Sequence, residues 1–170
     1  VTNCYSTGTA NGYNYVGGLI GRNWSYYFTS AIDGFVSRCY STGSVSGSYG
    51  VGGLVGSKTT WGGDIVIHSF WDIQTSGQAT SDGGTGLATN EMQDIRTYQE
   101  EGWDVVGEIR SGTHELWQIP EEGGYPVLTA FGGYTPPELQ GMGTEENPYL
   151  VSNAMELGAM IHYSPRAYYR

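Results

Sequence analysis

A 35-residue internal repeat constrains the fold of this chain more than any other feature. The segments VTNCYSTG and YVGGLIG, at residues 1–8 and 15–21, return as VSRCYSTG and GVGGLVG, at residues 36–43 and 50–56. Because Val1 corresponds to Val36, the offset is 35 residues, and it holds for both segments without a gap. A degenerate third copy follows, in which Ser69 stands at the position of Cys39. One copy is too short to bury an apolar face alone, so the copies are expected to stack.

The residues of each copy predict short strands. In residues 4–7 small and larger side chains alternate, a period-two pattern that places Cys4 and Ser6 inside and Tyr5 and Thr7 outside. A second strand is expected over residues 16–20, and again over 51–55, bent at the double glycine. We therefore predict an all-β fold, a parallel β-solenoid (β-helix) of ~35 residues per copy with a small capping region and short helices.

Composition changes divide the chain into four predicted parts. Residues 1–86 hold the repeats, and residues 87–128 form a closing segment that starts with a short helix carrying Met92 and Ile95. Residues 129–142, rich in Gly and Pro, are predicted to be a linker. Residues 143–170 are interpreted as the truncated start of a following module, so the chain is expected to be an internal fragment.

The repeat resembles a known family. NCYSTG at residues 3–8, followed by VGGLIG at residues 16–21, is similar to the GLUG motif of large bacterial surface and secreted proteins, which include adhesins and immunoglobulin A peptidases. The segment SFWD at residues 69–72 resembles the end of such a run, and the likeness covers about residues 1–128. It implies an extracellular or cell-surface location in a bacterium or archaeon and a repetitive β scaffold. It carries no catalytic motif.

The charge balance narrows the classes of partner. The chain has 17 acidic and 7 basic residues, a formal net charge of −10. Nucleic-acid binding requires a basic footprint, so no nucleic-acid partner is expected, and an anionic membrane or acidic polymer would be repelled. A neutral glycan, a cation or a host or cell-surface protein remains open. No apolar run is long enough for a membrane span.

No residue pattern predicts catalysis. Three acidic pairs, starting at Glu100, Glu121 and Glu145, stand in turn-like contexts and are interpreted as solvated loop charge. The histidines do not form a metal-binding motif; they are His68, His114 and His162. We expect no enzymatic activity in this chain and no cofactor.

A structural calcium ion and a disulfide are left open. Asp72, Asp82 and Asp94 lie among Gly, Ser and Thr and offer oxygen ligands, but no calcium-binding spacing is present and metal ligands stay unknown. Cys4 and Cys39 occupy equivalent positions, where either two buried thiols or a disulfide between stacked copies is compatible with the repeat.

The aromatic side chains carry the functional prediction. Equivalent tyrosines such as Tyr5 and Tyr40 are expected to stack as a structural ladder, whereas exposed aromatic rows bind sugar rings. The aromatics outside the strand positions vary between copies and are the predicted ligand-binding residues: Tyr13, Tyr15, Trp24, Tyr26, Tyr27 and Phe28. The sequence thus favours an extracellular adhesive or structural module, a stalk or spacer. The alternative is a carbohydrate-binding or carbohydrate-active β-helix fragment.

Overall fold

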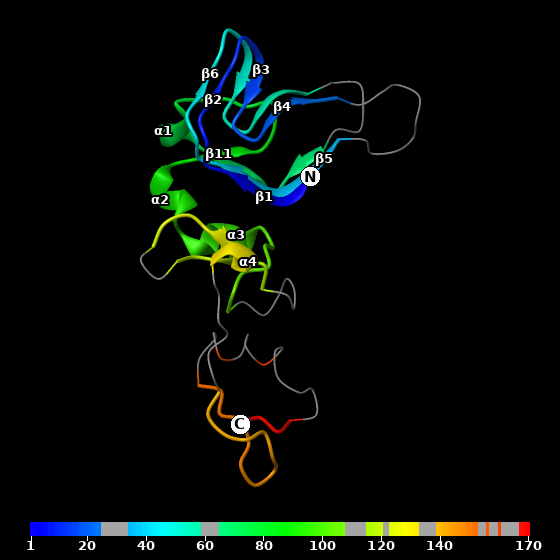
Figure 1. The fold of residues 1–170 in the computed structure, drawn as a ribbon, viewed down its shortest axis with the longest axis vertical. Helices are drawn as coiled ribbons and strands as arrows, with labels where there is room; N and C mark the ends of the chain where they lie inside the picture. Colours follow the sequence, from blue (N-terminus) through cyan, green and yellow to red (C-terminus); the bar gives the residue numbers. More distant parts are fainter. Residues whose placement is uncertain are drawn as a thin grey trace. The chain divides into compact units, whose positions relative to one another are not determined.

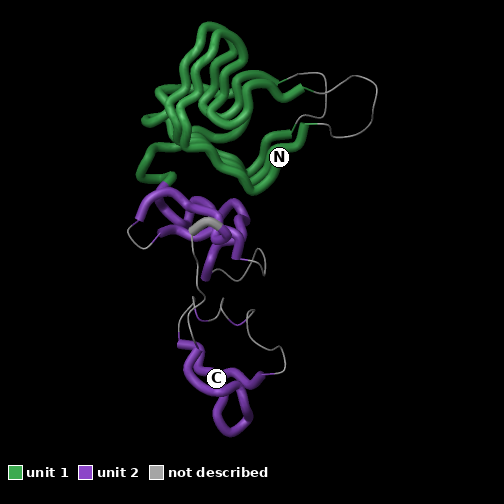
Figure 2. Tube along the Cα trace, in the orientation of Figure 1, with its two compact units in different colours: residues 1–92 green, residues 93–170 purple. Residues whose placement is uncertain are grey.

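The chain forms two compact units, Val1–Met92 and Gln93–Arg170 (Figure 2). The structure, a computed structural model, describes residues 1–24, 34–58, 65–107, 115–120, 123–132, 139–152, 156, 160 and 167–170. Of the described residues, 40 % are in strands and 14 % in helices. Among them, no helix combines the length and the apolar character that crossing a membrane requires.

The first unit is built around a five-stranded parallel sheet (Figure 1). Its strand order is β1 (Thr2–Ser6), β5 (Phe35–Ser41), β10 (Phe70–Asp72) and β11 (Thr85–Leu87), and β9 (Ile65–Ile67) also pairs with β5. Equivalent residues of the first two copies face each other, as in Cys4 opposite Cys39 and Tyr5 opposite Tyr40. The predicted pairing of the copies at a 35-residue offset is therefore observed in this sheet.

Three two-stranded parallel sheets complete the pairing of the first two copies. They are β2 (Ala10–Asn11) with β6 (Val45–Ser46), β3 (Asn14–Gly17) with β7 (Tyr49–Gly52), and β4 (Ile20–Asn23) with β8 (Val55–Lys58). Each again joins equivalent residues, for example Val16 with Val51. Every strand of the second copy thus lies beside its counterpart in the first.

The double glycine makes the corner between the second and third of these sheets. Backbone pairing between the copies continues through it, because Leu19 N–H donates to the Leu54 carbonyl at 3.0 Å. A Cβ on Gly53 would stand 1.9 Å from Cδ1 of Trp71, so no other residue fits there without displacement. The corner delivers Leu54 and Val55, both fully buried, into a core cluster with Trp71.

The third copy joins with a shorter offset. Phe70 pairs with Tyr40 and Ile65 pairs with Phe35, so the offset between paired residues is 30 instead of 35. The local backbone is nevertheless repeated, because the residues before the Cys, Cys and Ser positions all have left-handed φ: Asn3 (50°), Arg38 (52°) and His68 (48°). Ser69 therefore takes the place of Cys39, as the sequence predicts.

The prediction of an all-β parallel β-solenoid is wrong. The fold is mixed, of α/β type, with one five-stranded parallel sheet and several small, separate sheets. Turns and glycine corners divide each copy into strands of two to seven residues, and each of the smaller sheets contains two strands. Among the described strands, β9 and β10 join the third copy to the second through β5, and helices follow. The pairing of two copies is a local arrangement within this mixed fold.

Two short helices belong to the end of the first unit. The first, α1 (Ile73–Ser76), begins at Asp72, whose carboxylate accepts from the backbone N–H groups of Gln74 and Thr75, and ends at Gly77 with φ 68°. The second, α2 (Thr89–Met92), is joined to the same carboxylate, because the Thr89 hydroxyl donates to Asp72 at 2.7 Å. Asp72 is fully buried and holds both helix starts.

The second unit has an aromatic core. Its elements are α3 (Ile95–Glu100), the antiparallel pair β12 (Trp117–Gln118) and β13 (Val127–Leu128), and α4 (Thr129–Gly132). The ring centres of Tyr98 and Trp103 lie 4.9 Å apart, with an angle of 68° between the ring planes. Those of Trp103 and Trp117 lie 4.7 Å apart, with an angle of 52°. All three side chains are fully buried. The helix predicted to carry Met92 and Ile95 is in fact two helices, because Asp94 starts α3.

Candidate functional site

A cationic side chain links two of the predicted aromatic residues in the first unit. The Arg22 guanidinium carbon lies 3.8 Å from the centre of the Trp24 ring and 4.7 Å from the centre of the Tyr15 ring. Arg22 and Trp24 are two residues apart in extended chain, which brings their side chains to the same side. Cation–π contacts of this kind hold both partners in place at a modest energetic gain.

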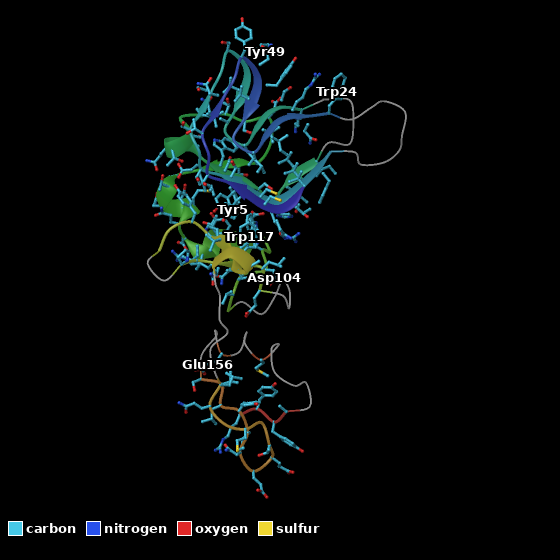
Figure 3. The ribbon with its side chains drawn as sticks, viewed as in Figure 1. Tyr5, Trp24, Tyr49, Asp104, Trp117 and Glu156 are labelled. Carbon is cyan, nitrogen blue, oxygen red and sulfur yellow. The ribbon has the colours of Figure 1, made fainter. Side chains whose placement is uncertain are left out.

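Two further tyrosines extend this group. The rings of Tyr15 and Tyr49 meet edge to face at 5.6 Å, and the Tyr13 carbonyl accepts from the Tyr49 backbone N–H at 3.1 Å. We call Tyr13, Tyr15, Arg22, Trp24 and Tyr49 the aromatic face. Three of its rings are strongly exposed, with Tyr13 at 75 %, Tyr49 at 63 % and Trp24 at 53 %. Figure 3 shows Tyr49 and Trp24 at the surface of the first unit.

The backbone fixes the position of this face. Tyr15 has φ 54°, a left-handed conformation that aromatic residues rarely adopt. Trp24 follows directly on β4, where the Asn23 side chain donates to the Gly34 carbonyl at 2.8 Å. This bond ties the end of β4 to the start of the second copy. The rings are therefore presented by paired strands and their immediate ends.

The second copy does not repeat the aromatic face. Its counterparts of Tyr15 and Arg22 are Gly50 and Ser57, read from the 35-residue register. The same strand pairing is thus built without the ring and without the cation. Neither is required by the scaffold, which distinguishes them from the pair Tyr5 and Tyr40, present in both copies.

Tyr5 and Tyr40 form the predicted structural ladder. Their rings stack at 5.3 Å with an interplanar angle of 9°. The expectation that this side of the strand faces outward is wrong for the second copy, because Tyr40 is only 1 % exposed and both sides of β5 are covered. These tyrosines belong to the packing and are not available to a ligand in the way that Tyr13 is.

The predicted site residues therefore fall into two groups. Tyr13, Tyr15 and Trp24 are brought together on the aromatic face, whereas Tyr26, Tyr27 and Phe28 lie outside the described residues. Sequence reasoning missed Arg22 as a member of the site. The signal for it is its spacing of two from Trp24 at the end of a predicted strand, which places both side chains on one side.

The structure does not bring the candidate calcium ligands together. Asp72 holds the helix starts, Asp82 accepts from the Lys58 backbone N–H at 3.0 Å, and Asp94 accepts from the Arg96 side chain at 3.0 Å. The Arg96 hydrogen bonds lower the pKa of Asp94 to about 2. Within the described ranges, no group of three His, Cys, Asp or Glu side chains is arranged to hold a metal ion.

The other charged and titratable candidates that the structure describes form no metal-binding group. His68 is exposed, and so are Glu100, Glu101, Glu145 and Glu146. The expectation of a loop is wrong for Glu100, which is the last residue of α3. His114, His162, Glu121 and Glu122 lie outside the described residues.

The two cysteines are free thiols in register on adjacent parallel strands. Each donates to the carbonyl two residues before it, Cys4 to Thr2 at 3.1 Å and Cys39 to Ser37 at 3.2 Å. Burial raises the pKa of the Cys39 thiol to about 11. These are properties of a small packed side chain and not of a reactive nucleophile.

Known proteins add no identity to this geometry. Comparisons with protein-family models, with curated proteins and with solved structures find no match. The functional interpretation therefore depends on the residues of the aromatic face themselves. Their chemistry is specific enough to be tested: apolar ring faces suit the C–H faces of sugars, and the guanidinium edge offers hydrogen-bond donors.

Proposed function

We propose that this chain is an extracellular or cell-surface adhesive module that binds carbohydrate through its aromatic face and has no catalytic activity of its own. The observation that carries the proposal is the exposure of Tyr13, Trp24 and Tyr49. The rings of Trp24 and Tyr49 are connected through Arg22 and Tyr15, and Tyr13 is joined to Tyr49 by a backbone hydrogen bond. The extracellular or cell-surface location is what the resemblance of residues 1–128 to GLUG repeats of surface proteins implies.

Leaving large aromatic side chains in water forgoes the free energy that their burial would contribute. Large apolar groups gathered on a surface mark binding sites more often than single exposed residues do. Tyr and Trp rings also lose little conformational entropy on binding, which suits them to weak, repeated contacts with sugars. The contact between Tyr15 and Tyr49 and that between Arg22 and Trp24 hold these rings before a ligand arrives. Binding through preorganised rings loses less free energy to ordering.

A structural stalk or spacer is the second candidate. It is favoured by the stacked pair Tyr5 and Tyr40 and by the in-register pairing of every strand in the two copies. Such a module holds another part of a surface protein away from the cell and needs no ligand. In a stalk or spacer the aromatic face has no role.

A glycan array of the full chain separates the two functions. We expect wild type to bind a subset of glycans, and Trp24→Ala and Tyr13→Ala each to lose most of that signal while circular dichroism is unchanged. Tyr168→Ala, at a tyrosine that is 51 % exposed in the second unit, is the matched control and should bind like wild type. Absence of binding to every glycan would reject the carbohydrate function and leave the spacer.

A further inference from the structure

Arg22 has unused hydrogen-bonding capacity on the aromatic face. It is exposed, and its interactions with other described residues are the ring contacts with Tyr15 and Trp24. Within the described part of the chain, no carboxylate pairs with it, whereas Arg96 pairs with Asp94. A guanidinium has five N–H donors in its plane, so contacts with ring faces leave donors at its edge for a ligand.

The charge of the repeat region does not oppose an anionic ligand, although the whole chain carries −10. Residues 1–58, the first two copies, contain three basic residues, Arg22, Arg38 and Lys58, and one acidic residue, Asp33, a net charge of +2. The acidic residues are concentrated later in the sequence. The expectation that an acidic polymer is repelled, which rests on the total charge, therefore does not hold for this segment.

The first copy maintains this arrangement against the preference of the scaffold. Tyr15 keeps its ring at a left-handed φ of 54°, where the second copy has Gly50 at 61°. Ser57, the counterpart of Arg22, shows that a small neutral side chain also suits this position in the strand pair. Because Gly50 shares this φ, the left-handed backbone belongs to the scaffold, and the tyrosine ring is what the first copy adds.

We propose that the aromatic face recognises sugars bearing an anionic substituent, a carboxylate or a sulfate, which Arg22 binds while the rings of Trp24, Tyr13 and Tyr49 contact the sugar faces. This inference deepens the proposed carbohydrate function and rests on it. Arg pairs with carboxylate and sulfate oxygens through two parallel N–H groups, which fixes the orientation of the sugar as well as binding it.

The test compares an oligogalacturonide with its methyl ester, which has the same sugars without the negative charge. By isothermal titration with the full chain, the free acid should bind at least about tenfold more tightly than the ester, and this preference should shrink as NaCl is raised. Arg22→Ser, which installs the side chain of the second copy, should remove the preference, and Arg22→Lys should restore part of it. Arg170→Gln removes one positive charge from the second unit and should leave it intact.

The outcomes distinguish this inference from the proposed function. Equal affinity for acid and ester, unaffected by Arg22→Ser but lost in Trp24→Ala, would overturn the role of Arg22 and keep carbohydrate binding. If Arg22→Ser and Arg170→Gln lose the preference for the acid equally, net charge explains that preference, and the proposed role of the aromatic face in it is overturned. Failure to bind the acid, the ester and sulfated oligosaccharides would overturn the inference, and the glycan array then decides whether neutral sugars bind.

Discussion

Tyr15 and Gly50 occupy the same position in successive copies of the repeat, and both have a left-handed backbone, with φ 54° and 61°. Only the tyrosine carries a cost for this, about 1–2 kcal/mol for a residue with a Cβ. Its ring contacts Tyr49 and Arg22 on the aromatic face. A glycine at this position would satisfy the fold, so the ring is better explained by binding than by stability.

Tyr15→Gly separates the two contributions. The substitution relieves backbone strain and removes ring contacts of similar size, so we expect the free energy of unfolding in urea to change by less than about 1 kcal/mol. Carbohydrate binding should fall sharply because Arg22 and Tyr49 lose their common partner.

Gly50→Ala is the matching substitution at the equivalent position of the second copy. The added Cβ combines a positive φ with a 2.9 Å approach to Cδ1 of Tyr15, so stability should fall by about 1–2 kcal/mol. For Tyr15→Gly, by contrast, unchanged carbohydrate binding would show that the Tyr15 ring has no part in recognition.

Gly8 and Gly43 test the stacking of the two copies. They are equivalent in sequence, but a Cβ on Gly43 would stand 1.8 Å from the Gly8 carbonyl oxygen, whereas a Cβ on Gly8 meets nothing within 4 Å. We expect Gly43→Ala to lower the free energy of unfolding by about 2 kcal/mol or more and Gly8→Ala to stay within about 0.5 kcal/mol of wild type. Equal losses in urea unfolding would contradict the register.

Ser69 connects the third copy to the second. Its hydroxyl donates to the Ile67 carbonyl at 2.8 Å and accepts from the backbone N–H of the buried Cys39 at 3.1 Å. Ser69→Ala leaves that N–H without its partner and should cost about 1–3 kcal/mol in urea unfolding. Ser69→Cys introduces the residue that the other copies have at this position, whose thiols donate to the carbonyl two residues before them. This variant should lose less stability than Ser69→Ala. If both variants lose the same amount, the hydroxyl is not what joins the copies.

The repeat was the predictable part of this protein. Identical residues at a constant offset predict both the pairing of Cys4 with Cys39 and the stacking of Tyr5 on Tyr40, because equivalent side chains of stacked copies must meet. The predicted solenoid was wrong, since a repeat in sequence sets neither the number of copies that pair nor the elements that come after them. Here the offset shortens at the third copy and short helices begin at Asp72, Thr89 and Asp94.

The aromatic face was predictable in part. The variable positions identified Tyr13, Tyr15 and Trp24, but no sequence pattern indicates directly that Arg22 contacts two of these rings. Sequence also cannot show that Tyr40 is buried while Tyr13 is exposed, because alternation along a strand does not reveal which faces are covered. Contacts between separate strands decide both.

The Cys39 thiol gives a prediction for pH dependence. Burial raises its pKa from 9.0 to about 11, so the folded state holds the proton more tightly than the unfolded state does. The resulting stability is fully present below about pH 9 and is lost as pH rises from 9 through 11. In urea unfolding at each pH, the loss should be about 2–3 kcal/mol larger in wild type and Cys4→Ala than in Cys39→Ala. The same slope in all three proteins would contradict burial as its source.

The most direct test of carbohydrate binding follows the five tryptophan indole N–H signals by NMR, during titration with oligosaccharides selected on the array. Trp24 is exposed, whereas Trp71, Trp103 and Trp117 are buried. Binding at the aromatic face should move the one signal that is missing from the spectrum of Trp24→Ala and leave the signals of the three buried rings in place. Binding that leaves the Trp24 signal unmoved, or that persists unchanged in Trp24→Ala, would contradict the account.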